Sequence, residues 1–366
     1  MRRRHFETLQ PHCPVCFRAD GRRERLQLSA VLKEERDVVL EGLLLCPAAQ
    51  CQREYPIIDG IPFLLAGLRR FLADNIFQLM SRDDLSDTIE SVVGDCCGQG
   101  SAFDVTRHQL GSYARDHYGA QDPAEQGAAD PPGGARRLLE LALERVTELP
   151  GGHVLDVGCS VGGTTFALAE RTGRLVLGVD LNLSMLRLAM SALHRGVVQY
   201  PLRRTGVVYD RRRFPVRFDR ADHVDFWACD IAALPFADDT FALAAMLNVV
   251  DCVTSPRDVL AEAVRVLAPR GRALISSPYD WSAAATPLEA WLGGHSQRGG
   301  NGGSSGAVLR ALLTAGAHPG SLSSVAVDAE WDAVPWRVRL HDRSVVEYAA
   351  HLVVARKLEA PHDRAS

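Results

Sequence analysis

The sequence has no long apolar run and almost no lysine. No stretch of about 18 consecutive uncharged apolar residues occurs in it, so it predicts no membrane-spanning helix. The basic start Met1–His5 is not followed by an apolar segment, which argues against a secretory signal peptide. Lysine occurs only at Lys33 and Lys357, and the other basic side chains are arginines spread along the whole chain. No internal repeat is visible, which argues against a solenoid or a repeat array.

Charge and composition are those of an ordinary globular protein. Hydrophobic residues make up 46% of the 366 residues and charged residues 23%. The formal net charge of −4 gives no overall attraction to nucleic acid or to anionic membranes. Nine cysteines without an export signal are more consistent with thiols or metal ligands than with a disulfide framework. We therefore expect a cytoplasmic protein with one large domain and a smaller appendage.

The order of sequence patterns divides the chain into four parts. Residues 1–68 contain short apolar runs broken by proline and glycine, which predict small strands and turns. Residues 69–135 begin with a helical pattern and end in a linker rich in alanine, proline and glycine. Residues 136–358 form the large domain, and 359–366 are predicted to be a flexible tail.

Strands and helices alternate in the large domain. This alternation predicts an α/β fold with a doubly wound, mostly parallel sheet. The expected strands are 153–157, 174–180, 224–230, 242–249 and 272–276, and the expected helices are 136–149, one beginning at 162, 184–195 and 256–267.

The segment Val154–Gly163, VLDVGCSVGG, carries the clearest functional signal. An apolar strand ends at Asp156, and the small residues after it allow a tight turn into a helix. Glycines at Gly158 and Gly162 let the backbone approach a ligand closely. The acid before the first glycine distinguishes this spacing from the Gly-x-Gly-x-x-Gly pattern of dinucleotide folds.

The segment resembles motif I of class I S-adenosylmethionine-dependent methyltransferases, which have a Rossmann-like fold. The resemblance implies that Gly158 and Gly162 approach the methionine part of S-adenosylmethionine, and that Asp156 helps to position its amino group. Asp180 ends the next strand, where a carboxylate can accept hydrogen bonds from both ribose hydroxyls. The residues that the resemblance assigns to the cofactor are Asp156, Gly158, Cys159, Ser160 (in place of the commoner middle glycine), Gly162, Asp180, Leu181, Asp230, Ile231 and Asn248.

The C-terminal half is similar to a narrower group, the mercaptohistidine N-methyltransferase domain of ovothiol biosynthesis. The similar segments are Asn248–Asp251, Ser276–Trp281, Thr286–Gly294 and Pro335–Arg343. The resemblance implies a small-molecule methyl acceptor, with the methyl group going to a nitrogen of an imidazole or of a related amino-acid derivative. Direct displacement needs no metal, so the protein supplies alignment and desolvation.

Three residues are candidates for the catalytic step. A carboxylate that accepts the second ring N–H would sharpen an imidazole nucleophile, and Asp251 is the first candidate for this base or orienting group. Asn248 and Tyr279 are its expected hydrogen-bonding partners. Alternatively, Asp251 lies in a helix N-cap region just before Ser255-Pro256, where the predicted helix 256–267 begins.

Aromatic and basic side chains near the C-terminus are candidates for acceptor binding. Trp281, Trp291 and Trp336 could form the wall of a pocket, since aromatic faces suit a planar ring and a sulfonium cation, or they could pack in the core. Arg337 could hold a substrate carboxylate, as could Arg339 and Arg343, although their alternation also fits the exposed face of a strand. The glycine-rich residues 293–306 form either a lid or a surface loop.

The N-terminal part carries a possible metal site. Cys13-Pro14-Val15-Cys16 has the spacing of a zinc knuckle, and Cys46 and Cys51 form a second pair. His12 is a less favoured substitute ligand. The segment Tyr55–Leu65 looks like the zinc-ribbon subunit that activates several tRNA, rRNA and protein methyltransferases, which implies a structural zinc and a stabilising role between domains. Alternatively, the part folds without metal and the cysteines are simply reduced.

Two other functions remain open at this stage. The arginine-rich insertion between Arg203 and Arg220 could contact RNA, which would suit an RNA base methyltransferase, or it could be a solvated loop. A non-catalytic scaffold that retains the fold is the third possibility. The sequence assigns no role to Cys96 and Cys97 and makes no prediction of the oligomeric state.

Overall fold

The computed structural model describes residues 1–68, 71, 99–322 and 324–359. Most of the predicted helical pattern that begins near residue 69 lies outside the described residues, as do Cys96 and Cys97. In the part that is described, no helix has the length and apolarity needed to cross a membrane.

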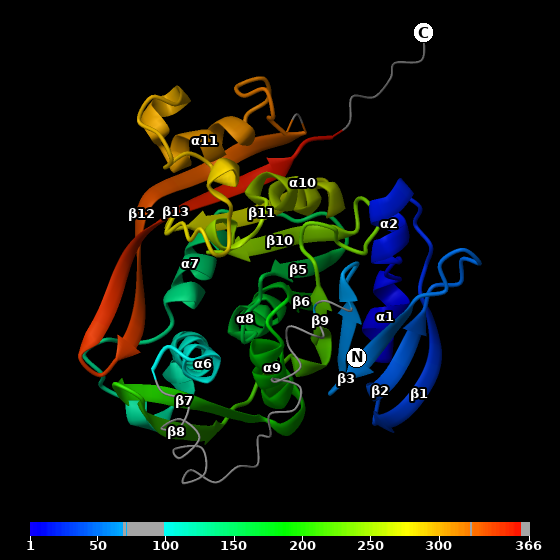
Figure 1. The fold of residues 1–366 in the computed structure, drawn as a ribbon, viewed down its shortest axis with the longest axis horizontal. Helices are drawn as coiled ribbons and strands as arrows, with labels where there is room; N and C mark the ends of the chain where they lie inside the picture. The colour runs from blue at the N-terminus through cyan, green and yellow to red at the C-terminus, as the bar shows by residue number, and fades with distance from the viewer. Residues whose placement is uncertain (69–70, 72–98, 323, 360–366) are drawn as a thin grey trace.

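A large sheet organises the molecule (Figure 1). Its central part consists of parallel strands that neighbour one another in the order β9, β6, β5, β10 and β11. The chain passes from β5 outward to β6 and β9 and then returns to the other side of β5, so the order reverses between β5 and β10. Ligands bind at such a switch point, beyond the carboxyl ends of the strands. These strands are β5 (His153–Val157), β6 (Val176–Asp180), β9 (Val224–Cys229), β10 (Phe241–Leu247) and β11 (Leu267–Ser277).

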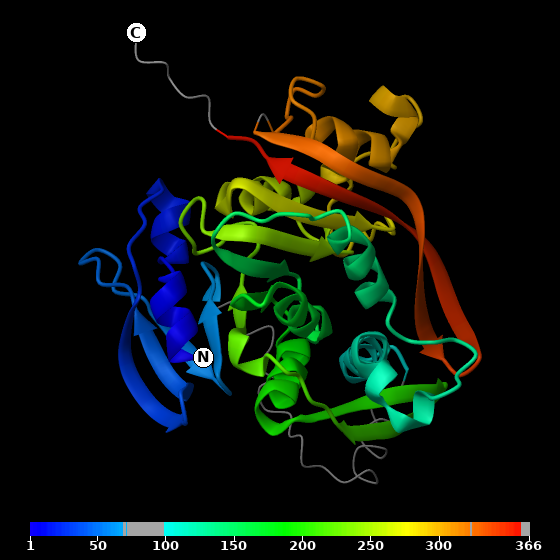
Figure 2. The same ribbon diagram turned by 180° about the vertical axis from the view of Figure 1, so that it is seen from behind.

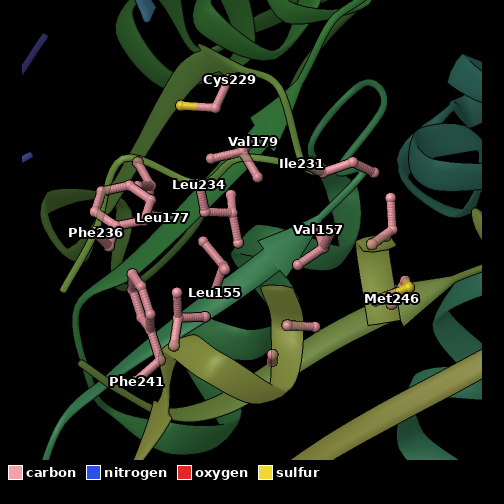
Figure 3. Close-up of a cluster of buried hydrophobic side chains, with 14 of the residues drawn as sticks. Leu155, Val157, Leu177, Val179, Cys229, Ile231, Leu234, Phe236, Phe241 and Met246 are labelled. Atoms are coloured by element: carbon pink, nitrogen blue, oxygen red, sulfur yellow. The ribbon is translucent and has the colours of Figure 1, made fainter. Parts of the chain in front are cut away.

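The central strands are buried on both faces, as expected for a parallel sheet covered by helices. Alternate residues of one strand enter different cores: Leu155 and Val157 lie in one cluster, and Val154 lies in the other. Figure 3 shows the first cluster, in which Leu155, Leu177 and Phe241 pack together. The fold is therefore the predicted Rossmann-like, doubly wound and mostly parallel sheet.

Helices cover both faces of the sheet. Side chains of α6 (Ala102–Tyr118), α7 (Gly134–Leu143), α8 (Gly163–Thr172) and α9 (Leu183–Arg195) join the second cluster, and those of α10 (Pro256–Val266) and α11 (Ser305–Leu312) join the first. The predicted helix 136–149 thus ends earlier, at Leu143. Short 3-10 helices are η1 (Gly119–Gln121), η2 (Pro123–Glu125), η3 (Ala221–His223), η4 (Val250–Cys252), η5 (Leu288–Ala290) and η6 (Gly300–Gly303).

The N-terminal part shares the sheet of the large domain. Its strands are β1 (Gln27–Glu35), β2 (Val38–Leu45), β3 (Glu54–Ile58) and β4 (Ile61–Leu64), and its helices are α1 (Arg3–Leu9) and α2 (Pro14–Asp20). β1 to β4 are antiparallel neighbours, and β4 then pairs in parallel with β9, with Phe63 opposite Ala228. No break in the sheet therefore separates the predicted first part from the large domain.

A separate two-stranded hairpin and a long arm of the large sheet both lie against α6 (Figures 1 and 2). The hairpin of β7 (Val197–Thr205) and β8 (Val208–Pro215) contains most of the arginine-rich insertion, which is therefore largely a folded hairpin rather than a loop, with Arg217 and Arg220 beyond β8. The long antiparallel pair β12 (Val325–His341) and β13 (Ser344–Lys357) joins the sheet through β11 and reaches down to α6 and the hairpin, where Ser112 Oγ donates to the carbonyl of Arg339.

Candidate functional site

The turn after β5 is held in place by the chain's own packing. Gly158 has φ +70°, and a Cβ at this position would lie 2.5 Å from a methyl group of Val249. Gly162 has φ +88°, and its Cβ would lie 2.5 Å from the ring of Phe226. Ser160 takes a left-handed φ of +52° without being glycine. The two glycines are therefore required by the close approach of neighbouring side chains as well as by backbone conformation.

The side chain of Asp156 is hydrogen-bonded to two threonines of α8. Its Oδ2 accepts hydrogen bonds from the hydroxyls of Thr164 at 2.7 Å and Thr165 at 2.6 Å. Burial raises the pKa of this carboxyl to about 6, although the two threonine hydroxyls act in the opposite direction. The structure thus gives Asp156 a role in fixing the turn, and its contact with the amino group of a cofactor stays a prediction.

Asp180 ties the ends of two neighbouring strands together. Its Oδ2 accepts from the backbone N–H of Ser160 at 2.8 Å, and its Oδ1 accepts from that of Asn182 at 2.7 Å. Burial raises the pKa of this carboxyl. Each carboxylate oxygen has two lone pairs, so each can still accept one hydroxyl hydrogen. Leu181, which follows, is 40% exposed and offers an apolar surface beside the carboxylate.

Asp230 and Ile231 follow β9 at the same edge of the sheet. Asp230 Oδ1 accepts from the backbone N–H of Ala232 at 2.9 Å, while its Oδ2 lies 3.6 Å from a guanidinium nitrogen of Arg18. Ile231 is 8% exposed. Arg18 belongs to α2, so the N-terminal part reaches this edge, a contact that no sequence signal indicated.

Asp251 lies beyond β10 with one oxygen unpaired. It is 2% exposed, its Oδ2 accepts from the backbone N–H of Asp280 at 2.8 Å, and its buried Oδ1 has no hydrogen-bond partner. Burial raises the pKa of its carboxyl. The alternative N-cap role is wrong, because Ser255 is the N-cap residue of α10 and Asp251 lies in η4. Asn248, with φ +56°, binds Ser276 through its backbone and its side chain instead of Asp251.

Tyr279, Trp281 and Trp291 form a stack of rings beyond β11. The centroids of Tyr279 and Trp281 are 6.3 Å apart, and those of Trp281 and Trp291 are 5.6 Å apart. The Trp281 indole N–H donates to Ser305 Oγ at 3.1 Å. The glycine-rich segment 293–306 contains η6, and Gly294 donates to the carbonyl of Gly303 at 2.7 Å; its role as a lid or as a surface loop stays a prediction.

Trp336 and Arg337 lie on β12, away from this stack. Trp336 is 6% exposed, stacks on Tyr348 and donates to Asp116 at 3.1 Å, so it packs in the core of the arm. Arg337 is exposed and pairs with Glu347. In the structure Trp336 packs in the core and does not lie with the other two tryptophans, and Arg337 lies on the exposed face of a strand.

Three residues that sequence reasoning missed lie around Asp251 and Tyr279. Burial raises the pKa of the Tyr113 phenol on α6, and the acidic groups of Cys252 and Asp251 act in the same direction. Tyr348 donates to Asp280 at 3.1 Å, and His351 lies 2.6 Å from the Tyr279 hydroxyl. No local motif marks these residues, because α6 and β13 reach the site only through the tertiary fold.

The four predicted cysteine ligands come together. The sulfur atoms of Cys13, Cys16, Cys46 and Cys51 all lie within 4.8 Å of one another, and two of the pairs are 3.8 Å apart. Four thiolates at about 2.3 Å from one zinc ion would lie roughly 3.8 Å from one another in a tetrahedron. His12 is not part of this group, and its ring packs against Phe17.

The part of the chain that runs from β5 to β11 is similar to known proteins. Residues 155–275 match the family model described as a methyltransferase domain. This stretch of the chain is therefore similar to methyltransferase domains. Methyltransferase GfsG of Streptomyces halstedii is 30% identical over 204 residues, which are 50% of this chain and 63% of that protein. Demethylmenaquinone methyltransferase of Renibacterium salmoninarum is 29% identical, covering 39% and 48% respectively.

The similarity covers only part of each protein. The chain spans less than two thirds of the length of these two curated relatives. Among solved structures, phosphoethanolamine N-methyltransferase 2 of Haemonchus contortus in complex with S-adenosyl-L-methionine is 21% identical, with a TM-score of 0.33, over 47% of this chain and 32% of that one.

Proposed function

We propose that the chain transfers the methyl group of S-adenosylmethionine to a nitrogen of a small-molecule acceptor, most specifically an imidazole or thiohistidine-like amino-acid derivative. The observation that carries this proposal is the arrangement at the switch point of the sheet. Asp180 ends β6 and Asp251 follows β10, and these two strands pair with β5 from either side, so both carboxylates lie at the carboxyl edge of the sheet at its switch point; Asp251 has one unpaired buried oxygen. A cofactor and an acceptor bound beside these two carboxylates would be neighbours.

The residues at the ends of β5, β6 and β9 fit the cofactor. The carboxylate of Asp180 retains lone pairs for two ribose hydroxyls, and Leu181 beside it offers an exposed apolar side chain to the base. Asp230 and Ile231 would contact the adenine, while Gly158 to Gly162 would border the methionine part. When bound, S-adenosylmethionine supplies an electrophilic methyl group on a sulfonium. The protein aligns the nucleophile with that methyl group and excludes water.

Asp251 is suited to orient the acceptor. An unpaired buried carboxylate oxygen is costly to leave unsatisfied, and an N–H of the acceptor would satisfy it. The stacked rings of Tyr279, Trp281 and Trp291 suit a planar acceptor. The hairpin does not favour the RNA alternative, since Arg203 pairs with Asp104, Arg204 with Asp210 and Arg212 with Asp122.

The proposal is tested by calorimetric binding of S-adenosylmethionine, followed by a product assay with mercaptohistidine, histidine and total RNA. Binding together with methylation of an imidazole compound supports the proposal. Methylated RNA would instead support a nucleic-acid acceptor, and absence of cofactor binding would overturn the assignment of the site.

We also propose that the four cysteines hold a structural zinc ion. Their spacing fits a tetrahedral site, and the buried Tyr55 hydroxyl lies 3.0 Å from the sulfur of Cys13, where it can orient this ligand. Mass-spectrometric metal analysis should find one zinc per chain. Cys13→Ser should lose it, whereas Cys252→Ser, at an exposed cysteine outside the cluster, should retain it. A metal-free wild-type chain would overturn this assignment.

A further inference from the structure

A chain of hydrogen-bonded side chains leads from Tyr279 into the space between β13, β12 and α11. The Tyr279 hydroxyl oxygen lies 2.6 Å from His351 Nδ1, and His351 Nε2 lies 2.7 Å from an oxygen of Glu330. Arg310 donates to the carboxylate of Glu330 through two nitrogens at 2.5 to 3.0 Å. The stacked ring of Tyr279 thus has a histidine and a paired carboxylate behind it.

The partners of His351 determine the direction of each hydrogen bond. Hydrogen bonding from Arg310 holds the pKa of the Glu330 carboxyl below its usual range, so that this carboxylate only accepts. His351 Nε2 therefore carries the hydrogen, and in the neutral ring Nδ1 accepts from the Tyr279 hydroxyl. The hydroxyl oxygen of Tyr279 keeps its lone pairs for a donor on its other side.

Tyr279 is held next to the acceptor side of the site at a cost in backbone energy. Its φ of +56° lies in the left-handed region, which is strained for a bulky residue. Its backbone N–H donates to Ser277 Oγ at 3.0 Å, and the following residue, Asp280, donates to Asp251. The same short segment therefore fixes Tyr279 and occupies one oxygen of the candidate orienting carboxylate.

We propose that Tyr279, His351 and Glu330 form a proton relay, an inference that rests on the proposed methyl transfer. As the nitrogen or oxygen of the acceptor bonds to the methyl group and the sulfur–methyl bond breaks, Tyr279 takes the N–H or O–H proton that the acceptor loses. The phenolic proton of Tyr279 moves to His351 Nδ1, and Glu330 stabilises the imidazolium. One positive charge disappears from the sulfonium and one appears on His351, so charge and protons balance.

The relay narrows the class of acceptor and the role of Asp251. The acceptor must lose a proton when it is methylated, as an imidazole N–H, an amine or a hydroxyl compound does. Asp251 then orients the acceptor by accepting at its unpaired Oδ1 a hydrogen bond from a different N–H, such as that of the amino group of an amino-acid derivative, and the proton lost on methylation leaves through Tyr279. Tyr279 is the catalytic residue of this relay, whereas His351 and Glu330 act through it.

The first test measures the hydrogen positions by nitrogen-15 NMR of labelled histidine, with His351 assigned by His351→Gln. Wild type should show a protonated Nε2 and an unprotonated Nδ1 at His351. Glu330→Gln should alter this pattern. Asp328→Asn is the matched control, because Asp328 is also a β12 carboxylate paired with arginines, Arg272 and Arg356. A protonated Nδ1 in neutral wild-type His351 would overturn the relay without any activity measurement.

The second test measures kinetics with whichever of mercaptohistidine and histidine is methylated. Tyr279→Phe and His351→Gln should each lower kcat by roughly 10²-fold or more, the usual contribution of general base catalysis, with the acceptor KM changed much less. Glu330→Gln should lower kcat to a smaller extent, and Asp328→Asn should not. S-adenosylmethionine affinity, measured by calorimetry, confirms that each variant is folded.

The outcomes separate the relay from the methyl transfer on which it rests. Unchanged kcat in His351→Gln, with an active wild type, would overturn the relay and leave the proposed function standing. A wild type that binds no S-adenosylmethionine, or methylates no acceptor, would overturn the proposed function, and with it the role of the relay. A parallel rise in KM and fall in kcat in all variants, Asp328→Asn included, would show a structural effect and overturn the relay.

Discussion

The two sides of the candidate site are built differently. On the cofactor side, Asp156, Ser160 and Asp180 lie within 25 residues of chain. The Asp180 carboxylate accepts a hydrogen bond from the backbone N–H of Ser160, and the Asp156 carboxylate accepts from two threonine hydroxyls of α8. On the acceptor side, Tyr279 and Asp280 bind His351 and Tyr348 of the arm, which are far away in sequence. The cofactor side is thus fixed locally, whereas the acceptor side depends on how the arm crosses the end of the sheet.

This difference has a chemical consequence. A binding site formed by short turns at the ends of parallel strands keeps its geometry when the surrounding strands and the arm are altered, because that geometry depends on few contacts with distant residues. The acceptor side changes whenever those distant elements change. We therefore expect substitutions on the two sides to affect different measurements, and the following predictions are ordered by the size of their expected effects.

Asp251→Asn should give the largest difference between the effect on turnover and the effect on cofactor affinity. The unpaired Oδ1 is an anionic acceptor in the wild type, and replacing the carboxylate by an amide should misplace the methyl acceptor and lower kcat by roughly 10²-fold. S-adenosylmethionine affinity should stay within a factor of about two, since orienting the methyl acceptor requires no contact with the cofactor. Calorimetry and steady-state kinetics with an imidazole acceptor measure the two effects, and equal turnover would remove the proposed role.

The same carboxylate predicts a pH dependence. Burial raises the pKa of Asp251, so the ionised form is lost as the pH falls through a value above the usual carboxyl range. The kcat of the wild type should therefore fall on the acid side of neutrality sooner than an exposed aspartate would require. In Asp251→Asn this limb should disappear from the pH profile, and its persistence would assign it to another group.

Asp180→Ala should act on the cofactor side alone. Loss of the hydrogen bonds from two ribose hydroxyls to a charged acceptor, each contributing about 1.5–3 kcal/mol, predicts an affinity for S-adenosylmethionine weaker by at least roughly 10²-fold. Asp222→Ala, at an exposed aspartate whose side chain is 69% accessible, is the control and should bind as the wild type does. Calorimetric affinity unchanged in Asp180→Ala would contradict the ribose assignment.

Asp156 offers a test of the cofactor side that needs no ligand. Its pKa rises from 3.8 to about 6, so the folded state holds this proton more tightly than the unfolded state does. The stability that it contributes is present below pH 3.8 and is lost as the pH rises through about 6, which amounts to roughly 3 kcal/mol. The difference in unfolding free energy between Asp156→Asn and wild type should therefore grow in favour of the variant between pH 4 and pH 8. Urea titrations at several pH values measure it, and a constant difference would disprove the shift.

The sequence was sufficient where physics is local. The apolar strand before Asp156, the glycines that follow and the acid at Asp180 predicted the sheet and the turns at its edge, because turn chemistry depends on neighbouring residues. The cysteine spacing predicted which sulfur atoms meet, since two knuckles bring four thiols to one point.

The sequence was insufficient where contacts cross the fold. His351 and Tyr113 carry no pattern of their own, and only the antiparallel pairing of β13 with β11 sets His351 opposite Ser277, near Tyr279. The arginines between Arg203 and Arg220 looked like a loop because charge patterning does not reveal partners such as Asp104 and Asp122. Register and ion pairing over long sequence separations are decided by packing, which composition does not encode.

Arg337→Ala should have the smallest effect, and it tests whether acceptor binding extends to this residue of the arm. Its guanidinium is exposed and pairs with Glu347 across the arm, and surface pairs of this kind contribute about 0–1 kcal/mol. The acceptor KM and kcat should therefore stay within a factor of about two, because losing so weak a surface pair leaves the strand pairing of the arm intact. Trp281→Ala, in the ring stack beside Tyr279, should by comparison raise the acceptor KM clearly. A large rise in KM in Arg337→Ala would mean that the arm moves in solution and that its arginine reaches the carboxylate of the bound acceptor.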